Sequence, residues 1–152
     1  STAGSFSASG CVACAVGQYD HDSSGLSAAT ACVACPLGKI QPITGQTVCD
    51  DCVVGQYQNS IGQTECIDCT LGKYVDSVGS TSAGDCIVCI AGKYVDVTGS
   101  DEASDCIDCV VGTYVEGSGS SLESLCTACE SGKYSSVLGS ASESNCIDCV
   151  AG

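Results

Sequence analysis

The chain has 152 residues and 16 cysteines, with no tryptophan, no methionine and a single phenylalanine. One cysteine in about ten residues indicates a disulfide scaffold, in which cross-links replace a large aliphatic core. Four lysines, no arginines and 18 acidic residues give a formal net charge of −14. This balance excludes the basic surface that nucleic-acid binding needs, and it disfavours an anionic membrane surface.

No membrane-spanning segment is predicted anywhere in the sequence. Apolar runs stay well below the ~18 residues that a span requires, and no basic-then-apolar leader opens the chain. We therefore expect no membrane insertion. The first residue is Ser1, which predicts either a processed product or a piece of a longer protein.

Every cysteine belongs to a Cys-x-x-Cys pair, and the pairs recur every 17 to 21 residues. Such a period is typical of a tandem array. Each repeat opens with a glycine, has an aromatic or apolar residue two positions later, and in most copies has a second glycine seven positions after the first. The array is continuous over residues 1–152, and its predicted units are 4–16, 17–37, 38–54, 55–71, 72–91, 92–111, 112–131 and 132–151.

Each unit is predicted to be a small β-hairpin. In GKYVDVTGSDEASDCIDC, residues 92–109, a β-prone segment follows the first glycine, a Gly-Ser turn follows, and a Cys-Ile segment returns. No stretch has the apolar period of an α-helix. Units this short bury too little surface alone, so we expect them to stack into an elongated, disulfide-rich rod with little or no helix.

The string Cys-x-x-Cys-x-x-Gly-x-Tyr, as in CIDCTLGKY and CIVCIAGKY, resembles the ephrin-receptor-like cysteine-rich repeats. These are similar in turn to the first module of the tumour-necrosis-factor-receptor cysteine-rich domains. Cys-x-x-Cys-x-x-Gly occurs eight times, and Tyr completes it in six copies, so the resemblance covers nearly the whole chain. It implies an extracellular protein, secreted or displayed on the cell surface.

Three chemistries use paired cysteines. Zinc ribbons need two pairs about 15 to 20 residues apart, which fits the spacing but would require four separate sites. A thioredoxin-like motif needs one pair at a helix start, and no helix is predicted. Structural disulfides in an oxidising compartment fit best.

The resemblance also implies the pairing, in which the second cysteine of one pair bonds the first cysteine of the next. The implied bonds are Cys14–Cys32, Cys35–Cys49, Cys52–Cys66, Cys69–Cys86, Cys89–Cys106, Cys109–Cys126 and Cys129–Cys146. Each would contribute roughly 3 kcal/mol by loop closure.

This pairing leaves Cys11 and Cys149 at opposite ends of the array. A disulfide needs Cα atoms within about 7 Å, so the two cannot meet inside one extended chain. One hypothesis is a bond between copies, which makes a head-to-tail homopolymer. The other is a bond to further repeats of a longer chain. Both remain open at this point.

The recurring aromatic residue is predicted to pack over its own disulfide and the neighbouring hairpin, as the only bulky core residue of a unit. These structural aromatics are Phe6, Tyr19, Tyr57, Tyr74, Tyr94, Tyr114 and Tyr134, with Ile40 in the third unit. Carboxylates recur at Asp51, Asp68, Asp108 and Asp148 and at Asp76, Asp96 and Glu116. A solvated face is favoured for them over a calcium site between units, and His21 is expected in a solvated loop.

No enzyme signature is present, so no catalytic residue, cofactor or metal ligand is predicted. Hydroxyls cluster near the second glycines, at 80–82, 118–121 and 140–144, and are expected to be exposed and able to carry O-linked glycans. The favoured function is an extracellular structural rod, either a filament subunit or a segment of a surface stalk. The alternatives are a receptor-like module that binds a protein ligand near Pro36, Ile40, Pro42 and Ile43, and a zinc scaffold.

Overall fold

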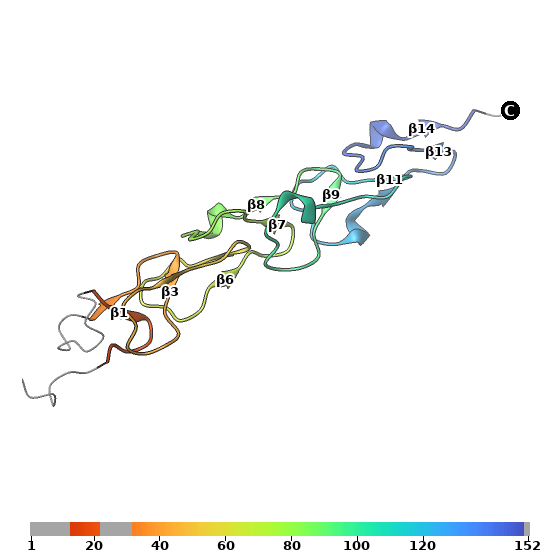
Figure 1. Ribbon diagram of the computed structural model, residues 1–152. Coiled ribbons are helices and arrows are strands. Elements are labelled where there is room, and N and C mark those ends of the chain that lie inside the picture. The colour runs from red at the N-terminus through yellow and green to blue at the C-terminus, as the bar shows by residue number, and fades with distance from the viewer. Residues whose placement is uncertain (1–12, 22–31, 151–152) are drawn as a thin grey trace, which may run out of the picture.

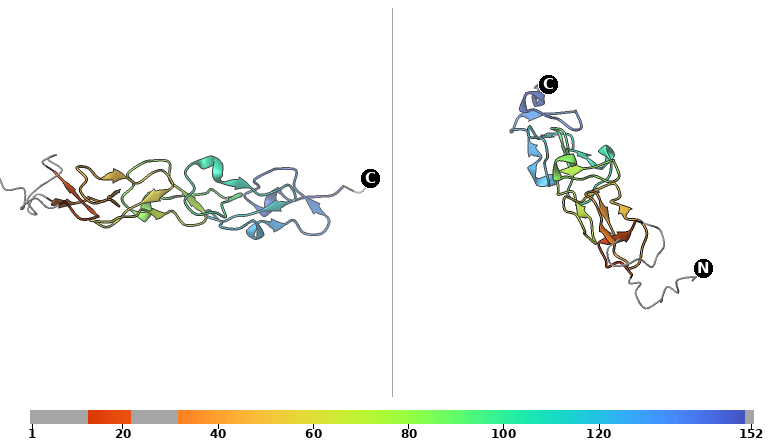
Figure 2. Two further views of the ribbon diagram at one scale, coloured as in Figure 1. Left: turned by 60° about the horizontal axis from the view of Figure 1, so that its bottom comes forward. Right: turned by 90° about the vertical axis from the view of Figure 1, so that its left-hand side faces the viewer.

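The computed structural model describes residues 13–21 and 32–150. They form an elongated rod, with β1 (Gln18–Asp20) near one tip and β14 (Ile147–Asp148) near the other (Figure 1). The rod keeps its narrow outline from two further directions (Figure 2). The hairpins follow one another along its length in chain order, so sequence position translates into distance along the axis.

All strands of the described residues pair in two-stranded antiparallel hairpins, and each hairpin lies inside one predicted unit. The pairs are β1 with β2 (Cys32–Ala34), β3 (Lys39–Ile40) with β4 (Asp50–Asp51), β5 (Gln56–Tyr57) with β6 (Ile67–Asp68), β7 (Lys73–Tyr74) with β8 (Ile87–Val88), β9 (Lys93–Tyr94) with β10 (Ile107–Asp108), β11 (Thr113–Tyr114) with β12 (Thr127–Ala128), and β13 (Lys133–Tyr134) with β14. The predicted fold class is confirmed.

A glycine with positive φ leads into each hairpin of the described residues, as at the third position of a type II turn. At β5 the amide of Gln56 donates to the carbonyl of Val53 over 3.2 Å, and Gly55 has φ +83°. That turn type requires a positive φ at its third position, which glycine adopts without steric cost. The opening glycine of the repeat is therefore the residue that turns the chain from the cysteine pair into the first strand.

Repeats of 20 residues differ from the 17-residue repeats 38–54 and 55–71 by a short 3₁₀ turn before the returning cysteine. These turns are η2 (Ala83–Asp85), η3 (Ala103–Asp105), η4 (Glu123–Leu125) and η5 (Glu143–Asn145). In η2 the Ser82 hydroxyl accepts from the amide of Gly84 at 3.0 Å, and the Asp85 carboxylate accepts from Thr81 at 2.8 Å. The extra residues thus satisfy much of their own hydrogen bonding and protrude without altering the stack.

The core is a series of small clusters built around the disulfides. In one of them Val75, 1% exposed, packs with the Cys69–Cys86 disulfide, and Tyr57 of the preceding repeat covers it. Aliphatic side chains elsewhere on the rod are largely exposed. Cross-links and backbone pairing therefore carry the stability that a globular domain of this size draws from a common core.

Candidate functional site

Seven disulfides run along the rod. They join Cys14–Cys32, Cys35–Cys49, Cys52–Cys66, Cys69–Cys86, Cys89–Cys106, Cys109–Cys126 and Cys129–Cys146, with Cα atoms 5.4 to 5.8 Å apart. These are the pairs that the sequence resemblance implies. Cys149 is a free, exposed thiol, and Cys11 lies outside the described residues.

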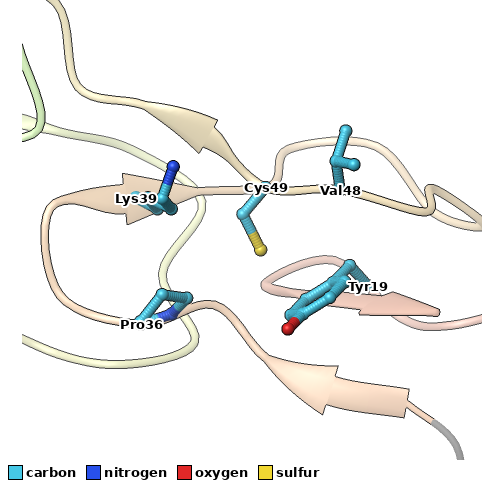
Figure 3. Close-up of a pocket in the computed structure, with 5 residues that line it drawn as sticks. All are labelled: Tyr19, Pro36, Lys39, Val48 and Cys49. Atoms are coloured by element: carbon cyan, nitrogen blue, oxygen red, sulfur yellow. The ribbon is translucent and has the colours of Figure 1, made fainter. Parts of the chain in front are cut away.

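The structural aromatics of successive repeats, which we call the aromatic column, contact the disulfides one repeat further along the rod. Tyr57 packs on Cys69–Cys86 and Tyr74 on Cys89–Cys106. Figure 3 shows the same relationship for Tyr19, whose ring lies beside the sulfur of Cys49. These contacts agree with the predicted packing on the neighbouring hairpin but not with packing on the ring's own disulfide, because successive hairpins overlap. Phe6 lies outside the described residues.

Each repeat is hydrogen-bonded to the next one through its backbone. The amide of Gly55 donates to the carbonyl of Val75 at 2.7 Å, and that of Gln58 to the carbonyl of Ser80 at 3.0 Å. A parallel bridge joins Tyr57 to Ser80. The same bridge recurs as Ile40–Gln63, Tyr74–Ser100, Tyr94–Ser120 and Tyr114–Ser140, so one interface is repeated along the described array.

A second set of contacts skips one repeat. The amide of Gly99 donates to the carbonyl of Cys69 at 2.9 Å, and the carbonyl of Gly99 lies against the Cα of Gly55. Equivalent amide bonds run from Gly62 to Cys35, from Gly79 to Cys52, from Gly119 to Cys89 and from Gly139 to Cys109. A repeat is therefore held by its neighbours on either side and also by the repeats beyond them.

The serine that follows the second glycine is buried, because its carbonyl takes part in the parallel bridge to the preceding repeat. Ser80, Ser120 and Ser140 are 6%, 8% and 1% exposed. The prediction of exposed hydroxyls is wrong at these three positions. Among the other hydroxyl residues of the three clusters, Thr81, Ser82, Ser118 and Ser144 are exposed.

The carboxylates within the cysteine pairs act mainly across their own hairpins. Asp51 and Asp108 form ion pairs with Lys39 at 2.6 Å and Lys93 at 2.8 Å, and Asp68 accepts from the amide group of Gln56 at 2.7 Å. Asp148, Asp76, Asp96 and Glu116 are exposed, as is His21. Within residues 13–21 and 32–150, no three His, Cys, Asp or Glu side chains converge as metal ligands would.

Burial raises the pKa of two tyrosines of the column. The pKa of Tyr94 lies above the ordinary value of 10.0, chiefly because the phenol is desolvated and secondarily because of the charges of Glu123 and Asp96. The pKa of Tyr114 is raised by the same main cause, and the negative charge of Glu143 makes the next largest contribution. The phenols are therefore held neutral, as expected for packing residues of the interface.

A shallow hollow lies at the third repeat, where the sequence suggested a ligand surface. Tyr19, Pro36, Lys39, Val48 and Cys49 line it (Figure 3). A second hollow on the rod is lined at matching repeat positions by Tyr74, Ile90, Lys93 and Cys106. The hollow is thus a feature of the repeat interface and does not distinguish the third unit.

The described end of the array at residue 150 exposes the groups that are covered elsewhere. Tyr134 is 43% exposed whereas Tyr94 is 9% exposed. Space beside the Cα atoms of Gly112 and Gly132 is open to at least 4 Å, whereas at Gly92 the carbonyl of Gly139 occupies it.

These features define a tandem-repeat protein held by a disulfide ladder. The family comparison agrees, since residues 38–86 match the model described as tyrosine-protein kinase ephrin type A/B receptor-like. The predicted resemblance is thereby confirmed over these residues, and the same ladder continues beyond them on both sides. A comparison with curated proteins found no match. Within the part of the chain that the structure describes, no helix has the length and apolarity of a membrane span.

Proposed function

We propose that this chain is an extracellular structural rod, used as a subunit of a filament or as a segment of a surface stalk. The observation that carries the proposal is the unbroken series of seven disulfides, in which every stapled hairpin is also hydrogen-bonded to its neighbours. Disulfides persist in oxidising compartments, and the ephrin-receptor-like match agrees with such a location.

Stiffness follows from the way the repeats overlap. Bending between two repeats would separate contacts such as Gly55–Val75, and it would also separate the next-but-one contact Gly99–Cys69. Each junction between two repeats is therefore crossed by hydrogen bonds between adjacent repeats and by hydrogen bonds that skip one repeat. The formal charge of −14 would keep parallel rods apart, so contacts at the ends are favoured over bundling.

Two uses of such a rod differ in what the terminal cysteines bond. In a filament, Cys149 of one copy bonds Cys11 of the next, and the homopolymer grows head to tail. In a stalk, the same cysteines bond further repeats of one chain. A receptor-like module is the alternative that the ephrin-receptor-like match also supports. The hollow near Pro36 recurs elsewhere on the rod, so it does not support a special ligand site there.

Disulfide mapping of unreduced protein from its native source tests the proposal directly. A Cys149–Cys11 peptide joining two chains, with loss of the assembly on reduction, would establish the filament. Bonds to other repeats would establish the stalk. Small-angle scattering of the same material should give the profile of a stiff rod, and a flexible-chain profile with all disulfides intact would contradict both uses.

We also propose that O-linked glycans decorate the rod at the exposed hydroxyls. Thr81, Ser82 and Ser118 project from the turns, whereas Ser80 and Ser120 are buried in repeat contacts. Glycopeptide mass spectrometry should find modification on the first set only. Unmodified peptides throughout would remove the proposal.

A further inference from the structure

We propose that the 3₁₀ turns are the preferred sites at which endoproteases cut this chain, and that such cuts leave the rod whole. The inference rests on the proposed extracellular rod and describes how it keeps its length where proteases are present. It is carried by the way the disulfides divide the chain into closed loops.

The closed loops are joined by very short linkers. Each disulfide joins the second cysteine of one pair to the first cysteine of the next, as in Cys69–Cys86 and Cys89–Cys106. Only the two residues inside a cysteine pair therefore lie between one loop and the next. Between Cys14 and Cys146 these linkers are residues 33–34, 50–51, 67–68, 87–88, 107–108 and 127–128.

A cut in a loop and a cut in a linker have different consequences. Hydrolysis of a peptide bond consumes one water and leaves a new carboxylate and a new ammonium group. Inside a loop, the two pieces of the chain stay joined through the S–S bond that closes that loop. In a linker no second bond spans the cut, so the chain separates into two parts. The rod is therefore divided by a single cut only at a linker.

The linkers are protected by their backbone contacts. They lie in the returning strands β2, β4, β6, β8, β10 and β12, each paired with the first strand of its hairpin. Beside the linker 67–68, the amide of Cys69 donates to the carbonyl of Gly55, and the carbonyl of Cys69 accepts from the amide of Gly99, both at 2.9 Å. Proteolysis requires local opening of the backbone, so this linker can be cut only after the hairpin and the contact between repeats have both opened.

The composition of the linkers gives a second kind of protection. They contain only Val, Ala, Asp, Ile and Thr. Every lysine, tyrosine and glutamate between Cys14 and Cys146 lies inside a loop. Proteases select the residue before the cut through a specificity pocket. Enzymes that cleave after lysine, tyrosine or glutamate therefore find their targets only where the chain stays joined.

The 3₁₀ turns are the accessible targets inside the loops. Glu102, Glu123 and Glu143 lie in or directly before η3, η4 and η5, and all three are exposed. The short coils of these turns lie at the margins of the rod (Figure 2). Their backbone bonds are local, since the amide of Cys126 donates to the carbonyl of Glu123 at 2.9 Å. Such a turn opens without breaking a backbone contact between repeats, and exposed turns are preferred sites of proteolysis.

A glutamate of a 17-residue repeat provides a control within the same chain. Glu65 is also exposed, but its carbonyl accepts from the side-chain amide of Gln58 at 2.6 Å, and Gln58 is buried. The next residue, Cys66, is held by a disulfide. The peptide bond after Glu65 is thus fixed on both sides. We expect it to be cut at least about tenfold more slowly than the bond after Glu102.

Digestion of the oxidised whole chain with a glutamate-specific endoprotease tests the proposal. Reduced samples should show cuts after Glu102 and Glu123. Unreduced samples in denaturant should still contain a single chain, heavier than the uncut chain by one water for each cut. Fragments released without reduction would overturn the proposal. Absence of cuts at the 3₁₀ turns, or a cut after Glu65 as fast as that after Glu102, would overturn it as well.

A conservative variant tests the protection of the linkers. Asp50→Glu places a glutamate in the linker 50–51, where Asp50 is exposed and pairs across its hairpin with Ile40. The unreduced variant should remain a single chain for as long as the parent does, because its linker is still paired. Release of the two parts on either side of residue 50 without reduction would show that pairing does not protect the linkers.

A second variant tests the contribution of the disulfides. Replacing Cys89 and Cys106 together with alanine opens the loop that contains Glu102. A cut after Glu102 should then divide the chain in denaturant without reduction, while a cut after Glu123 should not. If the variant stays whole although Glu102 is cut, the disulfide is not what joins the two pieces and the proposal fails.

Small-angle scattering of the cut, unreduced rod tests whether its shape survives. A cut repeat keeps its contacts with the repeats on either side, such as that between Gly99 and Cys69, so the profile should match that of the uncut rod. A profile of a flexible chain after cutting would overturn the proposal. It would leave the rod function standing, because that function is tested on the uncut protein.

Discussion

The carbonyl oxygen of Gly99 lies against the Cα of Gly55, two repeats earlier in the chain. A methyl group on Gly55 would occupy the space of that oxygen, and Gly55 already has φ +83°. This close approach brings the Gly99 amide to the Cys69 carbonyl. The opening glycine thus serves both the turn and the next-but-one contact.

Gly55→Ala should therefore destabilise the rod far more than Gly112→Ala. The two glycines have almost the same φ, +83° and +81°, but nothing lies within 4 Å of a methyl group at Gly112. We expect about 1–2 kcal/mol for the backbone strain at Gly112 and about 3 kcal/mol or more at Gly55, where backbone atoms must move. Thermal unfolding with the disulfides intact gives the comparison. Equal losses would show that the next-but-one contact contributes little.

Removing an internal disulfide should cost more than removing the last one. Cys69–Cys86 and Cys129–Cys146 both span 17 residues in sequence, so loop closure contributes roughly 3 kcal/mol in each case. The internal bond also packs against Val75 and Tyr57. Replacing both cysteines of each pair with alanine should reveal about 1–2 kcal/mol of additional loss for the internal pair. Chemical denaturation measures it, and a larger loss at the terminal pair would contradict this account.

Ser100 and Ser140 occupy the same repeat position and should respond differently to alanine. The buried Ser100 hydroxyl has no hydrogen-bond partner among the described residues, whereas the Ser140 hydroxyl accepts from Asn145 at 2.8 Å. Ser140→Ala should cost about 1 kcal/mol. Ser100→Ala should be neutral or slightly stabilising, since it removes an unsatisfied buried group. Melting temperatures of the two variants decide the matter, and the reverse order would refute the assignment.

The raised pKa of Tyr94 makes stability depend on alkaline pH. The folded chain holds the phenolic proton more tightly than the unfolded chain, whose pKa is about 10. The corresponding stability is complete below pH 10 and is lost as pH rises through the folded pKa. Tyr94→Phe removes this contribution, so its stability should fall less above pH 10 than that of the parent. Tyrosinate absorbance of the two proteins checks the assignment. If their difference titrates below 10, burial of the phenol is not the dominant influence.

The hairpins and the stacking of the repeats could be predicted from local sequence patterns. Gly55 and Tyr57 mark a turn and a strand within a few residues, and the cysteine period indicates stacking. Packing of each tyrosine on the neighbouring hairpin was predicted, but the disulfide that it contacts was not, because the extent to which hairpins overlap depends on contacts between repeats. The burial of Ser140 could not be predicted either. Its hydroxyl suggested an exposed residue, but Ser140 forms a β-bridge with the preceding repeat and is buried. The sequence did contain one signal for these contacts between repeats. The second glycine recurs regularly, and a recurring glycine marks a place of close backbone approach.

The alternation of cysteine pairs and disulfides also limits how far the rod can lengthen under load. A covalent path runs through the two residues of each pair and then across an S–S bond, bypassing the hairpin. Three residue steps reach about 10 Å, and a bond such as Cys69–Cys86 adds a Cα separation of 5.8 Å. A repeat without its bond could extend to about 70 Å. Pulling the ends apart would therefore extend each repeat to about 16 Å at most while its disulfide is intact, even after all hydrogen bonds have broken.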